Sequence, residues 1–143
     1  MLGRSGSGKG TQAKLLMKEF GNLYYVSTGD LFRKLAKSGS DVSHKVTEII
    51  NNGGLPFDDL ATTLWMHEVA FNVKRGQGII FDGAPRRLQE ANNMDRFLEF
   101  MGRLQDTRVI LVDITEKEAF DRLTKRRICK KCGFLVPWVG DYR

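Results

Sequence analysis

The residues best suited to chemistry come first, in the stretch Gly3-Arg4-Ser5-Gly6-Ser7-Gly8-Lys9. Its spacing is G-x-x-x-x-G-K, and a hydroxyl follows two positions later at Thr11. Glycines let backbone N–H groups point inward around an anion, and the N-terminus of a following helix adds partial positive charge. A lysine at this spacing reaches terminal phosphates. The stretch therefore predicts a phosphate-binding loop, with a tight turn and an incidental lysine as the simpler alternative.

Positive charge gathers at a second place, between Arg122 and Lys131. The chain carries a net charge of +6, and a basic surplus suits an anionic partner. Arg122 and Arg126 are four positions apart, which puts them on one side of a helix. Guanidinium forks match phosphate oxygens in pairs. The alternative is a solvated helix face, and Lys125 is interpreted as plain surface charge.

The only cysteines, Cys129 and Cys132, have the spacing C-x-x-C. This spacing favours a metal or redox role in a reducing compartment over a disulfide framework. A structural zinc ion needs four ligands, so the pair is half of such a site. A redox pair or two ordinary thiols remain alternatives. His44 and His67 lie far from the pair in sequence and are interpreted as surface or packing residues.

Along the chain, apolar positions alternate between helical and strand spacing. Helices are predicted over residues 11–21, 28–40, 40–54, 58–73 and 87–102, and from residue 115 onward. Strands are predicted over 22–27, 77–82 and 108–114, with Met1-Leu2 as the end of another. The T-x-x-E spacing from Thr115 to Glu118 is that of a helix cap, and Trp65 is assigned to the core. Continuous apolar strands between helices indicate an α/β fold whose parallel sheet is covered on both faces.

Bulk composition sets the remaining limits. A length of 143 residues, with 41% hydrophobic and 28% charged residues, suits one globular domain. The sequence has no apolar run of membrane-spanning length and does not open with a basic and then apolar segment. A cytoplasmic protein without a membrane partner is therefore expected.

Because Gly10 stands between Lys9 and Thr11, the loop reads G-x-x-G-x-G-K-G-T-Q. In this form it resembles the loop of the adenylate kinases and other nucleoside monophosphate kinases. Further segments resemble the same family in the same order: 27–33 (S-T-G-D-x-x-R), 81–86 (D-G-[FY]-P-R), 121–127 (the helix entering the lid) and 129–133 (the first half of a zinc-holding lid). The resemblance covers essentially the whole chain.

The resemblance implies a P-loop three-layer α/β fold with a parallel sheet. Residues 1–143 would form one kinase domain, with an inserted helical subdomain over 28–57 that binds the nucleoside monophosphate. Residues 127–143 would begin the lid. The sequence stops inside that expected lid, so the chain is interpreted as a fragment. On its own such a fragment is expected to transfer phosphate poorly or not at all, because it would lack the arginines of the lid and the lid closure that excludes water.

The implied reaction is reversible phosphoryl transfer from MgATP to AMP, which gives two ADP. Such a transfer needs alignment, charge neutralisation and exclusion of water. The residues expected to bind ATP are Gly6, Ser7, Gly8, Lys9, Gly10, Thr11, Arg122 and Arg126. Lys9 would stabilise the moving phosphoryl group, and Arg86 would clamp phosphates together with the two other arginines. Asp82, which ends an apolar strand, would organise Mg²⁺, with a turn cap as the alternative.

The residues expected to bind AMP are Thr28, Arg33, Gly54, Leu55, Gly83, Arg86 and Glu90. Without the resemblance, Thr28 would be an ordinary helix cap and Arg33 an exposed charge. Two departures from the family bear on the acceptor base: Glu90 stands where a glutamine is common, and Pro56 follows Leu55. An ionised carboxylate accepts a hydrogen bond from an amino group but cannot donate one to a ring nitrogen.

The resemblance implies AMP as the acceptor, and because of these two departures CMP, UMP and dAMP stay alternatives, with a pyrimidine monophosphate kinase as the alternative enzyme. A structural zinc ion held by Cys129 and Cys132 is expected in the complete protein. A further alternative is a non-catalytic binding module for nucleotides. Nucleic acid is disfavoured as a partner because the basic run lacks aromatic residues for base stacking. A monomer that binds ATP, AMP and ADP is expected.

Overall fold

The computed structural model describes residues 1–129, 131 and 135–136 of the chain. Its helices are α1 (Lys9–Phe20), α2 (Thr28–Ala36), α3 (Asp41–Asn51), α4 (Asp58–Asn72), α5 (Leu88–Phe100), the short 3₁₀ helix η1 (Leu104–Asp106) and α6 (Glu116–Lys125). Its strands are β1 (Leu23–Ser27), β2 (Gly78–Asp82), β3 (Arg127–Ile128) and β4 (Leu135–Val136). None of the helices in this described part combines the length and apolar character needed to cross a bilayer. The predicted alternation of helices and strands is confirmed.

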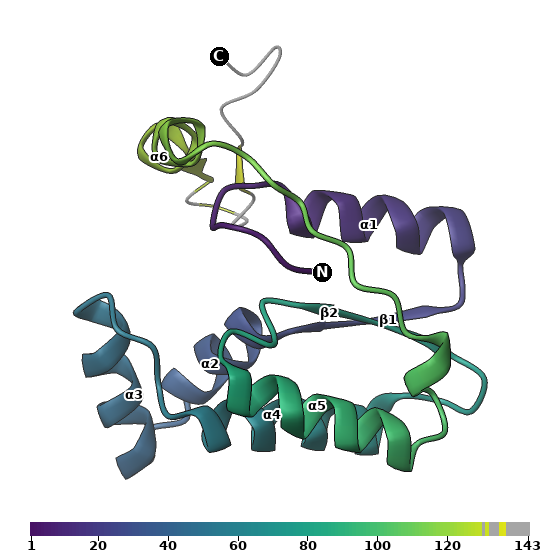
Figure 1. The fold of residues 1–143 in the computed structure, drawn as a ribbon. Coiled ribbons are helices and arrows are strands. Elements are labelled where there is room, and N and C mark those ends of the chain that lie inside the picture. Colours follow the sequence, from purple (N-terminus) through teal and green to yellow (C-terminus); the bar gives the residue numbers. More distant parts are fainter. Residues whose placement is uncertain (130, 132–134, 137–143) are drawn as a thin grey trace.

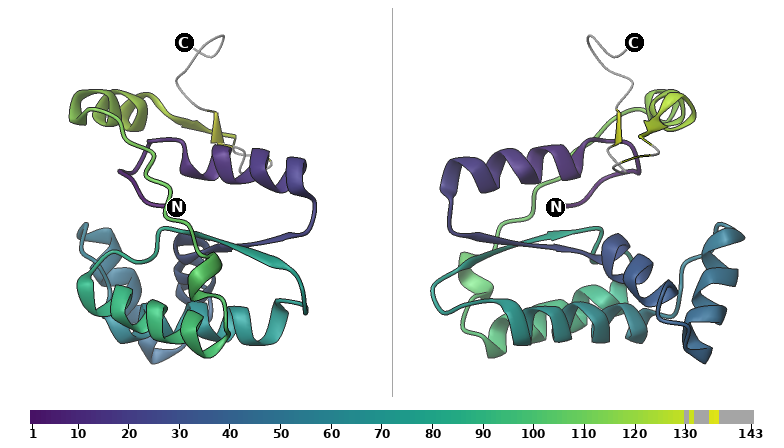
Figure 2. Two further views of the ribbon diagram at one scale, coloured as in Figure 1. Left: turned by 45° about the vertical axis from the view of Figure 1, so that its right-hand side comes forward. Right: turned by 180° about the vertical axis from the view of Figure 1, so that it is seen from behind.

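Strands β1 and β2 form a parallel pair, in register from Leu23 beside Gly78 to Ser27 beside Asp82. Helix α1 lies on one face of this pair, and α4 and α5 lie on the other (Figure 1, Figure 2). Parallel neighbours require a crossover between them, and here the crossover contains α2, α3 and α4. The predicted parallel sheet with helices on both faces is therefore confirmed.

The main apolar core lies between the strand pair and the layer of α4 and α5. Its buried members are Val26, Trp65, Val69, Ala84, Met94 and Leu98. Trp65 is fully buried and meets the rings of Phe81 and Phe97 edge to face, with centroids 5.7 Å and 5.5 Å away. The assignment of Trp65 to the core is confirmed.

A second, smaller apolar cluster joins α2, α3 and α4. Phe32, Val46 and Ala61 are its buried members, one from each helix. Helix α3 stands away from the sheet and is attached to the body through this cluster (Figure 1). The cluster thus attaches α3 to α2, and α2 itself begins directly after β1 and contacts β2, near the strand ends where the candidate residues lie.

Three helices begin with a hydroxyl side chain that accepts a hydrogen bond from a backbone N–H. Ser27 accepts from Asp30 at 3.3 Å, Ser40 from Ser43 at 3.2 Å, and Thr115 from Glu118 at 3.2 Å. Each bond satisfies one of the donors that a helix N-terminus leaves unpaired. The cap predicted at Thr115 is confirmed, and the cap of α2 lies one residue before the predicted Thr28.

The strand predicted over residues 108–114 is wrong in extent. Leu111 forms only an isolated parallel bridge with Leu2, supported by bonds from Leu2 N to Ile110 O at 2.8 Å and from Val112 N to Leu2 O at 2.9 Å. Val109 and Leu111 are 74% and 64% exposed. An apolar run becomes a strand only where a neighbour pairs with it, and within the described residues Leu2 alone pairs with this one.

Candidate functional site

The loop that precedes α1 has the geometry of an anion cradle. Gly3, Gly6 and Gly8 have φ angles of 141°, 83° and 97°, a region that side chains other than glycine rarely adopt. A Cβ on Gly3 would stand 2.2 Å from the carbonyl oxygen of Val112, so the space admits no side chain. The hydroxyl of Ser7 is buried without a hydrogen-bond partner among the described residues. The loop leads directly into the N-terminus of α1, whose first N–H groups favour an anion.

Lys9 lies across this loop. Its Nζ donates to the carbonyl oxygens of Gly3 and Arg4, both at 2.8 Å. Burial lowers the pKa of Lys9, Asp82 acts in the opposite direction, and the positive charge of Arg86 lowers the pKa further. The structure therefore brings Lys9, Asp82 and Arg86, which come from two distant segments, within electrostatic range of one another.

Asp82 ends β2 beneath the first turn of α1. Its Oδ2 accepts a hydrogen bond from the Tyr25 hydroxyl at 2.5 Å. A Cβ on Gly10 would lie 3.5 Å from the Tyr25 oxygen and 3.6 Å from Oδ2, which places both groups against the helix. Burial and the bond to Asp82 raise the pKa of Tyr25, so the hydroxyl stays protonated and donates.

The Asp82 carboxylate fits a role beside Mg²⁺ better than the role of a turn cap. Among the described residues no backbone N–H donates to it, and its Oδ1 accepts no hydrogen bond. Carboxylate oxygens are the ligands that Mg²⁺ prefers, directly or through its water shell. The donor chemistry and the position next to Gly10 therefore suit a magnesium nucleotide.

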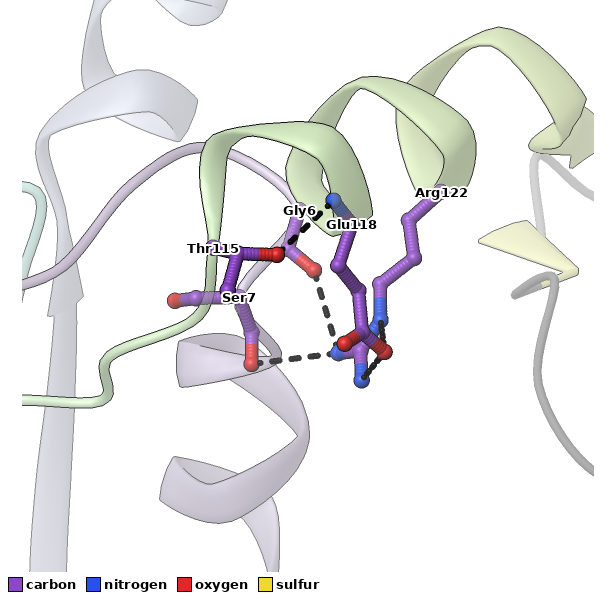
Figure 3. A network of polar contacts seen from close by, with 5 residues as sticks. All are labelled: Gly6, Ser7, Thr115, Glu118 and Arg122. Carbon is purple, nitrogen blue, oxygen red and sulfur yellow. Dashed lines mark hydrogen bonds and ion pairs between the residues drawn. The ribbon is translucent and has the colours of Figure 1, made fainter.

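Arg122 joins α6 to the glycine loop, as Figure 3 shows. Its Nε and Nη2 donate to Oε1 of Glu118 at 3.1 Å and 2.7 Å. Its Nη1 points at the carbonyl oxygens of Gly6 and Ser7, at 3.4 Å and 3.5 Å. Arg122 thus lies at the loop, where the sequence placed it.

Arg126 does not share a helix side with Arg122, and this expectation is wrong. Helix α6 ends at Lys125, and Arg126 continues with extended backbone angles, φ −66° and ψ 131°, toward β3. The spacing i, i+4 predicts a common side only while the helix lasts. Lys125 forms an exposed pair with Asp121 at 3.6 Å, in agreement with its assignment to the surface.

A cleft of about 300 Å³, open solvent included, lies where α2, α4 and α5 meet. Its lining residues are Thr28, Phe32, Leu55, Pro56, Asp58, Ala61, Arg86, Arg87 and Glu90. Four of the residues expected to bind AMP are among them: Thr28, Leu55, Arg86 and Glu90. Segments separated by tens of residues in sequence thus converge on one concave surface.

The cleft contains two buried polar atoms without hydrogen-bond partners in the described part of the chain. They are the hydroxyl oxygen of Thr28 and Oε1 of Glu90, on residues that are each 3% exposed. Leaving buried polar atoms unpaired costs free energy. A ligand with complementary polar groups would remove this cost, which favours a specific occupant of the cleft.

The other oxygen of Glu90 anchors the loop that carries Arg86. Oε2 accepts the backbone N–H of Arg86 at 2.7 Å, while the Arg86 Nε donates to the Gly83 carbonyl at 2.8 Å. Burial raises the pKa of Glu90, against the lowering effect of Arg86. The Trp65 indole N–H also lowers the pKa from nearby, although its geometry falls outside that of a hydrogen bond.

The raised pKa of Glu90 predicts a pH dependence of stability. A raised folded-state pKa stabilises the fold below the ordinary glutamate pKa and loses this effect as the pH rises through the folded-state value. The E90Q variant should lack that loss, so its free energy of unfolding should decline less than that of the parent between pH 4 and pH 8. Urea unfolding of both proteins across this range measures the difference. Parallel pH profiles would contradict the prediction.

Three residues expected at the acceptor site lie outside the lining of the cleft. Arg33 is exposed and pairs with Asp30 at 2.5 Å. Burial alone would raise the pKa of Asp30, but hydrogen bonds from Arg33 and Ser27 bring it below its ordinary value. Gly54 donates its N–H to the Ile49 carbonyl at 2.9 Å, and Gly83 accepts from Arg86. Arg33, Gly54 and Gly83 are thus engaged in contacts of their own outside the cleft lining.

Sequence reasoning missed the residues that hold these groups in place. Arg87 pairs with Asp58 and connects the start of α5 with the start of α4 at the rim of the cleft. Tyr25 and Glu118 hold Asp82 and Arg122. The spacing i, i+4 between Glu118 and Arg122 is a signal that the sequence contained. The other two contacts cross between distant segments and leave no such local signal.

The predicted metal pair falls partly outside the described residues. Cys129 is half-buried just after β3, and Cys132 lies outside the part of the chain that the structure describes. Among the described residues, no three histidine, cysteine, aspartate or glutamate side chains gather as a metal site would require. His44 and His67 are exposed, and His67 stacks on Phe71, as expected for surface residues.

Comparison with known proteins gives one consistent result. The family model described as "Adenylate kinase" matches residues 1–141. The adenylate kinase of Kosmotoga olearia is 37% identical over 133 residues, 93% of this chain and 60% of that relative. The adenylate kinase of Thermosipho africanus is 38% identical over 96% of this chain and 63% of that relative. The adenylate kinase of Anaeromyxobacter sp. (strain K) is 38% identical over 93% of this chain and 61% of that relative. The chain thus spans about three-fifths of the length of these relatives.

Proposed function

Because this chain belongs to the adenylate kinase family, we propose that it binds ATP and AMP and serves the reversible transfer of a phosphoryl group between them. One observation carries the proposal. Lys9, whose Nζ donates to two carbonyl oxygens of the glycine loop, lies within electrostatic range of Arg86, which lines the cleft. A donor phosphate chain in the loop and an acceptor phosphate in the cleft would therefore meet beside these two cations.

The donor end of the site would hold phosphates by charge and by backbone N–H groups. Lys9 now donates to two loop carbonyl oxygens, and on binding its ammonium group would turn to the phosphate oxygens instead. The N-terminus of α1 adds partial positive charge at the same place. Arg122, held beside Gly6 and Ser7, would supply a further cation at the loop.

The acceptor end would hold AMP in the cleft. Arg86 would bind the phosphate of AMP, while Thr28 and Glu90 would meet the base with their unpaired oxygens. Oε1 of Glu90 accepts hydrogen bonds, so it complements the exocyclic amino group of adenine. Phosphoryl transfer asks the protein mainly for alignment and for stabilisation of negative charge, and these residues would provide both.

Mg²⁺ would accompany ATP, and Asp82 would be the residue that organises it, directly or through its water shell. When bound, the ion would neutralise phosphate charge and fix the phosphate chain. Asp82 would hold the hydrated ion in place and would partly offset the positive charge of Lys9 and Arg86.

The remaining parts of the proposal concern segments at the edge of the site. Residues 28–57 would be the mobile subdomain that closes over AMP, and residues 127–143 would begin the lid. Cys129 and Cys132 would supply two ligands of a structural zinc ion. We further propose a monomeric protein in the cytoplasm, where ATP and AMP are available.

A panel of nucleoside monophosphates tests the choice of acceptor. Calorimetric titration of the chain with AMP, CMP, UMP and dAMP should show AMP binding tightest. UMP should bind about tenfold more weakly or worse, because its oxo group leaves the Glu90 oxygen unmatched. Tighter binding of CMP or UMP would instead support a pyrimidine monophosphate kinase. Binding of ATP without any monophosphate would support a nucleotide-binding module.

A further inference from the structure

Two neighbouring tyrosines on β1 form the same kind of hydrogen bond on opposite faces of the sheet. Tyr24 donates to Oε1 of Glu68 on α4, and Tyr25 donates to Oδ2 of Asp82, both at 2.5 Å. Successive residues of a strand point to opposite faces. Tyr24 therefore ties β1 to the layer of α4, whereas Tyr25 faces α1 and the candidate site.

The bond from Tyr25 reaches along the sheet to the end of the next strand. The backbone of Tyr25 pairs with Ile80, and Asp82 lies two residues further along β2, opposite Ser27. The tyrosine ring spans this distance and delivers its hydroxyl to the carboxylate beneath Gly10. Ligands of open parallel sheets bind at the carboxyl ends of the strands, which is where Asp82 stands.

A fixed donor on one oxygen decides where the other oxygen points. A carboxylate at a strand end can rotate, and the bond to Oδ2 selects one of its orientations. Oδ1 then faces a constant direction, and it accepts no hydrogen bond among the described residues. Mg²⁺ tolerates little departure from octahedral geometry, and groups that orient its ligands affect how tightly it is held.

We propose that Tyr25 is a positioning residue, whose hydroxyl orients Asp82 toward the hydrated Mg²⁺ of a bound nucleotide. Tyr25 thereby sets how strongly Mg²⁺ favours nucleotide binding, without touching the nucleotide itself. The inference rests on the proposed function, because it assumes that the glycine loop binds ATP.

The test compares Y25F with Y24F, which loses the same kind of hydrogen bond on the other face of the same strand. The Kd for ATP is measured for the parent and both variants, in excess Mg²⁺ and in EDTA. The advantage of Mg²⁺ is the Kd for ATP in EDTA divided by the Kd in excess Mg²⁺. In Y25F this ratio should shrink about three- to tenfold, while the Kd in EDTA stays within about twofold of that of the parent. In Y24F the advantage should equal that of the parent.

An unchanged advantage of Mg²⁺ in Y25F, or an equal decline in Y24F, would overturn the positioning role. Absence of ATP binding by the parent in both conditions would instead overturn the proposed function. Should Y25F fail to fold, ¹⁹F NMR of the parent labelled with 3-fluorotyrosine measures instead how the tyrosine resonances respond to Mg²⁺. Adding Mg²⁺ to the ATP complex should shift the resonance of Tyr25 and not that of Tyr24, and a stationary Tyr25 resonance would overturn the inference.

Discussion

Replacing Lys9 by methionine should weaken ATP binding about thirtyfold, which corresponds to about 2 kcal/mol. Methionine keeps the unbranched shape and the helix propensity of lysine but removes the ammonium group. That group is half-buried, and the two carbonyl oxygens that it contacts lie on the loop expected to surround the phosphates. A hydrogen bond to a charged phosphate is worth more than the bonds to neutral carbonyl groups that it replaces.

Lys18 offers a matched control for this change. It lies exposed in the last turn of the same helix, so K18M removes an equal charge away from the loop. The two variants should unfold at similar urea concentrations, while only K9M loses affinity in calorimetric titration with ATP. Equal affinities for ATP in K9M and K18M would contradict the role given to the loop.

Truncating Trp65 to alanine should lower the free energy of unfolding by about 3–5 kcal/mol. Trp65 is fully buried and connects α4 with Phe81 of β2 and Phe97 of α5. Its removal would leave a cavity between the helical layer and the strand that carries Asp82. Urea unfolding followed by far-UV circular dichroism measures the loss.

Phe71 provides the control, because it is 76% exposed on the same helix. F71A removes a large aromatic ring from the surface and should alter stability by less than about 1 kcal/mol. Should W65A not fold, W65F keeps an aromatic ring at the centre of the core and should show a smaller loss than W65A. Equal stabilities of W65F, F71A and the parent would contradict the central place given to Trp65.

The sequence predicted most of the elements because their signals are local. The glycine at position 21 ends α1, the hydroxyl of Thr115 begins α6, and β-branched and aromatic residues mark β1. Such features depend on residues a few positions apart, which is the range over which caps and periodicity act. Segment 108–114 shows the limit of that reasoning, since among the described residues only Leu2 pairs with it.

The site was predictable in its residues but not in their partners. Motif spacing singled out Lys9, Asp82 and Arg86, and the structure brings these three together. It could not show that Glu90 holds the backbone of Arg86, or that Tyr25 holds Asp82, because these contacts depend on packing between elements. Arg126 was misplaced because the helix that carries Arg122 ends one residue before it.

Glu90 is a residue that the sequence singled out and whose contacts only the structure shows. Its identity departs from the glutamine that the family resemblance implies. One of its oxygens accepts the backbone N–H of Arg86, and the other is buried without a hydrogen-bond partner among the described residues. In the proposed function, the carboxylate would support Arg86 through this bond while its other oxygen would present an acceptor to the base. A side chain with both tasks restricts which bases fit, and the acceptor panel measures that restriction directly.

Calorimetric titration with a dinucleotide of two adenosines joined by a chain of phosphates tests the central claim most directly. The account predicts a single binding site that spans the glycine loop and the cleft. The dinucleotide should then bind about 100-fold tighter than ADP alone, because the second half binds intramolecularly. It should also displace both ATP and AMP. An affinity no greater than that of ADP, or displacement of only one nucleotide, would contradict the claim that the loop and the cleft form one phosphoryl-transfer site.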